Sequence, residues 1–170
     1  MTSVVAFNHL SYSMINIIAS RFKNRGDELS AYEVMGEPVI QQKSGGKTPP
    51  QLENFFANVL QTIRKVDKER WFLLSPGPWG KPTNYIGFDG FNIQDDRIIY
   101  NAHMYLPDQF THQGIRTRPK GVEYPGRIKG EHWDRKMVEE KLAIMKKISK
   151  ETQLPNLYRR VSSGRWSKGS

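Results

Sequence analysis

The sequence predicts a single α/β domain, residues 1–170, built on a parallel sheet. Segments with helical and with strand-like apolar patterns alternate along the chain, which is the order that βαβ units produce. Trp71–Leu74 is continuously apolar, as a strand covered on both faces would be. A chain of 170 residues is also long enough to form a hydrophobic core without disulfides or metals.

The first half of the chain carries three regular segments. Apolar residues between Leu10 and Phe22 recur at three- and four-residue spacings and predict a helix. Leu29–Met35 has the composition of a strand, which should stop near Gly36. The next helix is expected to have Thr48 as its N-cap and to extend over Pro49–Val66 with one apolar face.

The second half continues the alternation with longer irregular links. After Trp71–Leu74, a turn-rich link leads to a second strand at Ile98–Tyr105. The segment Leu106–Trp133 is rich in Gly, Pro and charge and is expected to be a long loop. A helix is predicted over Met137–Ile148, and Asn156–Ser162 could be a last strand.

The composition excludes several kinds of site. The sequence contains no cysteine, which rules out disulfides, thiolate metal sites and cysteine nucleophiles. No apolar run approaches the ~20 residues needed to cross a bilayer, and no secretory signal is recognisable.

Ser44–Thr48 resembles the end of a phosphate-binding loop, but a flexible loop explains it better. Asp89, Asp95 and Asp96 are typical of turns, so we expect no metal and no cofactor.

The chain is basic, with a net charge of +9, and most of the excess lies after residue 100. Such an asymmetry can mark a surface that binds phosphate groups. It leaves a nucleic-acid-binding protein open as an alternative, although an ordinary solvated surface explains the charges better. The clearest group lies in the predicted long loop and comprises Arg116, Arg118, Lys120, Arg127 and Lys129.

Three motifs stand out in order along the chain: Tyr32–Pro38, Pro76–Gly80, and Ile98–Tyr105 running on to Phe110–Gly114. In sequence, order and spacing they resemble glycoside hydrolase family 5, the cellulase family. The resemblance implies a partial (β/α)8 TIM barrel, with chemistry at the C-terminal ends of its strands. The segments would be strands four to seven, so the first three strands and the last strand are missing. An incomplete barrel would leave helix faces and sheet edges uncovered, which predicts self-association.

The resemblance also implies a set of site residues. Family members hydrolyse with retention, using one carboxyl group as acid and base and a second as nucleophile. Glu37 takes the position of the acid and base. Gly36 stands where the family has an asparagine that holds the sugar 2-hydroxyl, so this contact is lost. His103 and Tyr105 match a His-x-Tyr that lines the sugar site, and Trp79 is a further candidate for sugar binding.

The position of the nucleophile departs from the family pattern. Counting back from Arg165-Trp166 places Arg160 where the family has a glutamate between Gly and Phe. An arginine cannot attack the anomeric carbon as a carboxylate does. Codons for Asn156–Val161 can be chosen so that reading one base later gives Ile-Tyr-Ile-Gly-Glu-Phe, which makes a frame slip one hypothesis for this position.

The expected function is therefore hydrolysis of O-glycosidic bonds in a β-glucan or a related polysaccharide, with the activity of this chain left open by Arg160. One alternative is a non-catalytic carbohydrate-binding protein in which Trp79, His103 and Tyr105 form a sugar platform. The other is the basic nucleic-acid binder. The expected partner is thus a polysaccharide or oligosaccharide, and no membrane is expected. The compartment stays open: members of the resembling family are often secreted, but no signal peptide is recognisable in this sequence.

Overall fold

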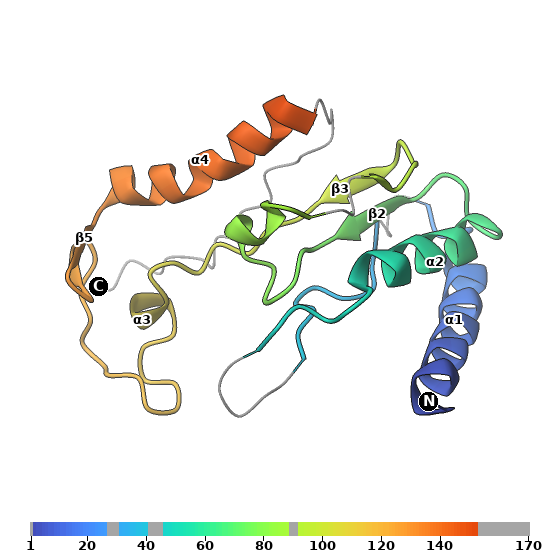
Figure 1. The fold of residues 1–170 in the computed structure, drawn as a ribbon, viewed down its shortest axis with the longest axis horizontal. Helices are drawn as coiled ribbons and strands as arrows, with labels where there is room; N and C mark the ends of the chain where they lie inside the picture. The colour runs from blue at the N-terminus through green and yellow to red at the C-terminus, as the bar shows by residue number, and fades with distance from the viewer. Residues whose placement is uncertain (1, 27–30, 41–45, 89–91, 153–170) are drawn as a thin grey trace.

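The computed structural model describes residues 2–26, 31–40, 46–88 and 92–152 of the chain (Figure 1). None of the helices in these ranges is long and apolar enough to cross a membrane. The elements follow in the order α1 (Thr2–Phe22), β1 (Ala31–Glu33), α2 (Leu52–Arg64), β2 (Trp71–Leu74), η1 (Pro82–Tyr85), β3 (Ile98–Tyr100), α3 (Asp108–Thr111), β4 (Gly126–Ile128), β5 (Glu131–Trp133) and α4 (Arg135–Thr152).

Strands β1, β2 and β3 form a parallel sheet with β2 in the centre. Phe72 of β2 pairs with Tyr32 of β1 on one side and with Ile98 of β3 on the other. Helix α2 connects β1 to β2, which confirms the predicted α/β class with a parallel sheet. Phe72, Leu73 and Leu74 are at most 8% exposed, so β2 is covered on both faces as its apolar run predicted.

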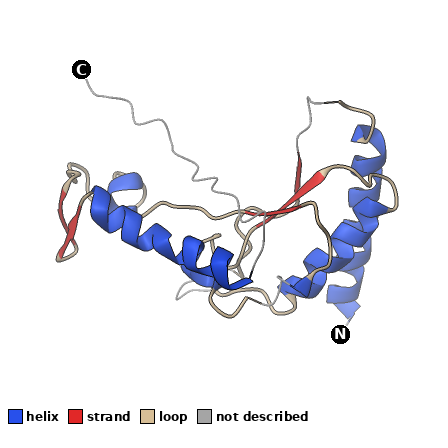
Figure 2. Cartoon of the chain, turned by 90° about the horizontal axis from the view of Figure 1, so that it is seen from above, coloured by secondary structure: helices blue, strands red, loops and turns tan. Residues whose placement is uncertain are grey.

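The core lies between the sheet and α2. Phe56, Val59 and Ile63 of α2 are at most 1% exposed. The Phe56 ring meets Phe72 edge on, with ring centroids 6.1 Å apart. Helix α1 and the β4–β5 hairpin lie at opposite ends of the molecule, in both Figure 1 and Figure 2. The sheet and its C-terminal edge therefore occupy the middle.

Arg70 and Asp67 tie the end of α1 to the sheet. Arg70 donates hydrogen bonds to the backbone carbonyls of residues 23, 25 and 26, which follow α1. It also donates to the buried Asp67 carboxylate, which accepts the hydroxyl of Tyr32 at 3.0 Å. Burial alone would raise the pKa of Asp67, but the hydrogen bonds from Arg70 and Tyr32 outweigh it and hold this pKa below the usual range.

Helix α2 begins later than predicted, so Thr48 is not its N-cap. The N-cap residue is Gln51, which has a left-handed φ of 59° and makes no side-chain cap hydrogen bond. The prediction was wrong because other contacts hold the segment before the helix. Lys47 forms a β-bridge with Ile40, and Thr48 packs so closely against Gly77 that a Cβ atom at residue 77 would lie 3.0 Å from the Thr48 side chain. In a phosphate-binding loop, a helix would start directly after Lys47 and Thr48. Here α2 starts only at Leu52, so the segment lacks that geometry.

The predicted strand Ile98–Tyr105 was too long, because only its first three residues form β3. After β3, the carbonyl of Asn101 accepts a hydrogen bond from the hydroxyl of Tyr85 at 2.6 Å, and this hydroxyl also lies 3.1 Å from the carbonyl of Leu74. The backbone N–H of His103 then donates to the carbonyl of Gly80 at 2.7 Å. After β3 the chain therefore follows the loop that leaves β2.

The expectation of a structureless loop over Leu106–Trp133 was wrong in part. Helix α3 and the antiparallel β4–β5 hairpin lie within it, and Ile128 and Trp133 of the hairpin are buried. Strands of three residues are too short to show a period of two in the sequence. The helix predicted for Met137–Ile148 is confirmed as α4. The possible strand Asn156–Ser162 lies outside the described residues.

Helix α1 is confirmed, but it turns part of its predicted apolar stripe to solvent. Met14, Ile17 and Ile18 are 60%, 66% and 45% exposed. On another side of the helix, Tyr12 stacks on Phe55 of α2 with ring centroids 6.2 Å apart. Grouped exposed apolar side chains favour contact with another surface, in agreement with the uncovered helix face expected of an incomplete barrel.

Stability at high pH is expected to depend on Tyr32. Burial, then the hydrogen bond and charge of Asp67, raise the pKa of Tyr32 from 10.0 to about 12. The pKa of Tyr32 is higher in the folded chain than in the unfolded chain. Its contribution to the free energy of unfolding is therefore fully present below pH 10.0 and is lost as the pH rises towards about 12. The urea midpoint should fall over this interval, and fall less in Tyr32→Phe, which has no phenol to ionise. An equal fall in both proteins would contradict the assignment.

Ile17→Glu is expected to weaken self-association of the chain, because it places a charge within the exposed apolar group of α1. Sedimentation velocity over a concentration series measures the effect. The matched control is Asn58→Glu, which adds the same charge at an exposed position of α2. If both variants dissociate the protein equally, net charge and not the α1 face governs its association.

Candidate active site

The described members of the predicted site follow the three parallel strands. Glu37 comes after β1, Trp79 after β2, and His103 and Tyr105 after β3. The C-terminal ends of parallel strands lie at the same edge of a sheet, and in barrel enzymes this edge carries the chemistry. The topology therefore brings to one region residues that are far apart in the sequence.

Glu37 and His103 are in direct contact. Nδ1 of His103 lies 2.9 Å from Oε1 of Glu37, although 66 positions separate the two residues. The side chain of Glu37 is 43% exposed, whereas that of His103 is 14% exposed. A largely buried ring thus holds a carboxyl group that remains reachable from solvent, which suits proton exchange with a bound molecule.

The His103 ring is confined by Gly80. If residue 80 had a Cβ atom, it would lie 3.2 Å from Cγ of the ring and 3.1 Å from the carbonyl oxygen of Gly36. Gly80 also has a φ of 63°, which residues with a side chain rarely adopt. Glycine is therefore needed at this position both for the backbone conformation and for the space that the ring occupies.

Asn101 is a neighbour of His103 that the sequence analysis missed. Its amide nitrogen donates to Oε1 of Glu33 at 3.2 Å and to Oγ of Ser75 at 3.3 Å, and lies 3.4 Å from Nε2 of His103. Asn101 and Ser75 are buried. Asn101 and His103 are two positions apart just after β3, so period-two alternation could have pointed to Asn101, whereas the bends after β1 leave no such signal for Glu33.

Tyr105 lies between two histidine rings. Its ring is edge on to His103 at 5.6 Å and to His112 at 5.3 Å, measured between ring centroids. Thr111 donates its hydroxyl to the carbonyl of Tyr105 at 2.6 Å and lies 2.8 Å from Nδ1 of His112. His112 belongs to one of the three sequence motifs, but its contact with Tyr105 depends on the turn through α3.

Trp79 and Gly36 occupy different surroundings. Trp79 has a φ of 56°. Its ring packs so closely on Gly46 that a Cβ atom at residue 46 would lie 2.8 Å from the ring. Nζ of Lys81 is 5.2 Å from the centroid of the same ring. At Gly36, a Cβ would meet Oε1 of Glu33 at 3.1 Å. That oxygen accepts a hydrogen bond from Asn101, so a side chain at position 36 would require Glu33 to shift.

Several other candidates have local explanations or lie elsewhere. Arg160 is outside the described residues. Arg118 pairs with Asp108 at 3.2 Å. Asp95 accepts two hydrogen bonds from Arg64, at 2.7 and 3.0 Å, so an ion pair explains this carboxylate. Within the described ranges, no three His, Asp or Glu side chains are placed to hold a metal ion.

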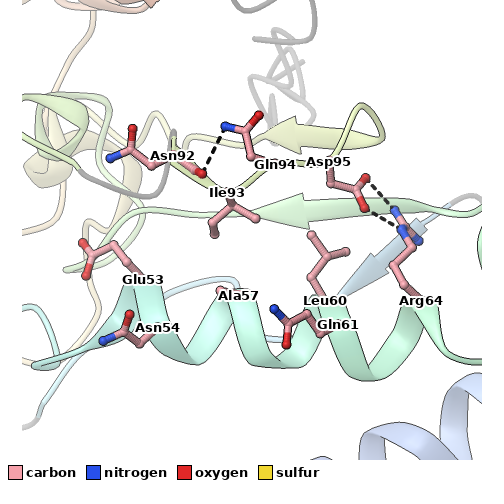
Figure 3. Close-up of a pocket in the computed structure, with 10 residues that line it drawn as sticks. All are labelled: Glu53, Asn54, Ala57, Leu60, Gln61, Arg64, Asn92, Ile93, Gln94 and Asp95. Atoms are coloured by element: carbon pink, nitrogen blue, oxygen red, sulfur yellow. Dashed lines mark hydrogen bonds and ion pairs between the residues drawn. The ribbon is translucent and has the colours of Figure 1, made fainter.

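A pocket of about 570 Å³ lies between α2 and the segment before β3 (Figure 3). Ala57, Leu60 and Ile93 contribute apolar surface, and the Arg64–Asp95 ion pair lies at one end. None of the predicted site residues lines it. The pocket is therefore separate from the contact between Glu37 and His103.

The sequence is similar to that of known endoglucanases. A family profile described as "Cellulase (glycosyl hydrolase family 5)" matches residues 7–151. Endoglucanase H of Acetivibrio thermocellus is 33% identical over 97 residues, which are 56% of this chain and 10% of that protein. Endoglucanase C of the same organism is 29% identical over 119 residues, 66% of this chain and 32% of that protein. The chain spans about a third or less of the length of these curated relatives.

Solved structures share the fold. Endoglucanase Cel5A from the hyperthermophilic Thermotoga maritima superposes with a TM-score of 0.68 at 24% identity, over 90% of this chain and 47% of that chain. The cellulose synthase subunit Z (CcsZ) from Clostridioides difficile gives a TM-score of 0.66 at 18% identity, over 89% and 48%. At these identities the likeness shows the fold alone, over about half of each neighbour.

Gly80→Ala is expected to destabilise the protein more than Gly87→Ala. Both glycines have a positive φ, 63° and 70°, so alanine costs about 1 kcal/mol of backbone strain at each. Nothing lies within 4 Å of a Cβ at Gly87, whereas at Gly80 it would meet the carbonyl oxygen of Gly36 and the ring of His103. We expect an additional loss of roughly 1–3 kcal/mol at Gly80 from this overpacking, measured by urea unfolding. Equal losses would mean that the ring can move aside.

Proposed function

The chain belongs to glycosyl hydrolase family 5, the cellulase family, and we propose that it acts on a β-linked glucan or a related polysaccharide with retention of configuration. Its parallel sheet and helices are part of a (β/α)8 barrel. We propose further that residues 1–170 form one domain. The observation that supports the activity best is the contact between Glu37 and His103 after parallel strands.

Glu37 is the proposed general acid and base. In this role a carboxyl group protonates the oxygen of the leaving sugar and then takes a proton from the attacking water. The partial exposure of Glu37 allows contact with substrate, and His103 fixes its position. Tyr105 is 36% exposed beside His103 and offers an aromatic ring suited to a sugar. Trp79 is proposed as a second aromatic contact, from the loop after β2.

The mechanism needs a second carboxylate as nucleophile, and the sequence has Arg160 at the position that the resemblance assigns to it. A guanidinium group is positively charged and cannot form the covalent glycosyl intermediate. Sequencing of the gene over the codons for Asn156–Val161 decides whether a frame slip produced this residue. An unshifted gene would leave arginine as the true residue and the nucleophile as lost.

Arg160→Glu is expected to confer hydrolysis of aryl glycosides and soluble β-glucans, because it supplies the missing carboxylate. Adding Glu37→Gln should lower the rate by at least about 100-fold, since the acid and base is then removed. Arg160→Gln is the matched control, which removes the positive charge without adding a nucleophile. Reducing-sugar release and aryl release are the measurements.

If none of the variants hydrolyses any substrate, in protein shown to be folded, the result would contradict catalysis by this chain. It would favour a second candidate, carbohydrate binding without turnover, in which Trp79, His103 and Tyr105 hold the sugar. The observation that favours this candidate is that Trp79, His103 and Tyr105 are retained, whereas the sequence has arginine at position 160 and glycine at position 36. Saturable binding of β-glucan oligosaccharides without product, followed by calorimetry, would support it.

A further inference from the structure

We propose that Asn101, oriented by Glu33, fixes His103 in the tautomer that carries its proton on Nδ1, facing Glu37. Asn101 and Glu33 are positioning residues in this scheme, because they act on Glu37 through the imidazole ring. The inference rests on the proposed function for its catalytic consequence, whereas the tautomer itself follows from the contacts around the ring.

Glu33 determines which way the Asn101 amide faces. An ionised carboxylate accepts hydrogen bonds and donates none. The Asn101 atom 3.2 Å from Oε1 of Glu33 is therefore the NH2 nitrogen, since the carbonyl oxygen would place two acceptors against each other. Oγ of Ser75, 3.3 Å from the same nitrogen, accepts as well. The buried amide thus has one favourable orientation.

The same NH2 group faces His103. Its nitrogen lies 3.4 Å from Nε2 of the ring, so a proton on Nε2 would point at another donor. The amide has two hydrogens for three neighbours, namely Oε1 of Glu33, Oγ of Ser75 and Nε2, and no acceptor faces a proton on Nε2 there. A neutral ring therefore carries its proton on Nδ1. Nδ1 is 2.9 Å from Oε1 of Glu37, so this N–H donates to the carboxyl group.

Among the described residues, the remaining neighbours of the ring leave this arrangement undisturbed. On the side of β1, the titratable groups are Glu37, in contact with Nδ1, and Glu33, beyond Asn101. After β3, Tyr105 meets the ring edge on. From β2 and its loop come Ser75 and Gly80, which carry no charge. Within the part of the chain that the structure describes, the Asn101 amide is thus the group placed to set the tautomer.

The tautomer decides where Glu37 keeps its proton. With the N–H of Nδ1 donated to Oε1, the proton that Glu37 transfers as an acid sits on Oε2. In the other tautomer, Nδ1 would offer a lone pair and accept that proton, which would withhold it from the substrate. Asn101 therefore keeps His103 from competing with the leaving oxygen for the acidic proton.

Nitrogen NMR of the whole chain, with isotope in the histidine rings, tests the tautomer directly, because protonated and bare ring nitrogens resonate far apart. The His103 signals are assigned by their loss in His103→Gln. We expect Nδ1 to be the protonated nitrogen in the neutral ring. A proton on Nε2 in the unaltered chain would overturn the proposal.

Asn101→Asp tests the cause, since it replaces the NH2 group by an oxygen of the same shape. The neutral ring should then carry its proton on Nε2, where the new oxygen can accept it. Glu33→Gln, a second variant, should leave a mixture of tautomers, because glutamine can present either group to Asn101. Asn58→Asp, exposed on α2, is the charge control and should leave the tautomer unchanged.

The outcomes separate this inference from the proposed function, because the NMR experiment needs neither substrate nor turnover. An unchanged tautomer in folded Asn101→Asp would overturn the role of Asn101 even if Arg160→Glu hydrolyses glucan. In an active Arg160→Glu background, Asn101→Asp should also move the alkaline limb of the pH–rate profile, where the general acid Glu37 loses its proton. A uniform loss of rate at every pH would indicate a merely structural role and count against the proposal.

Discussion

The central strand β2 is paired on both sides, and the arrangement of the site depends on this pairing. Phe72 lies opposite Tyr32 and Ile98 in a parallel register, and it is fully buried under Phe56 of α2. A one-residue slip of a strand would exchange its two faces. The register therefore fixes which side chains point along the edge where Glu37 emerges.

The site is assembled from close backbone approach as much as from side chains. Gly36 and Gly80 let the loops after β1 and β2 come together around His103, and the carbonyl of Gly80 binds the backbone N–H of His103. The ring then bridges the exposed carboxyl group of Glu37 and the buried amide of Asn101. A surface acid is thus connected to a buried polar network that has little freedom to reorient.

Two devices hold α1 to this framework, and they leave one of its faces open. Arg70 binds the chain after the helix and the buried Asp67 at the same time, while Tyr12 stacks on Phe55 of α2. Met14, Ile17 and Ile18 nevertheless face solvent. The chain spans about half the length of its solved neighbours, and the exposed face is the kind of surface that further packing covers.

Local patterns in the sequence determined the α/β class, strand β2, helices α2 and α4, and the three motifs of the family. Each of these depends on spacings of a few residues, which the chain displays directly. The tertiary structure alone decided that Thr48 lies against Gly77 instead of capping α2, and that β3 ends at Tyr100. It also brought Glu33 to Asn101 across 68 positions. Contacts at such separations leave no period in the sequence, because they arise only when the strands pair.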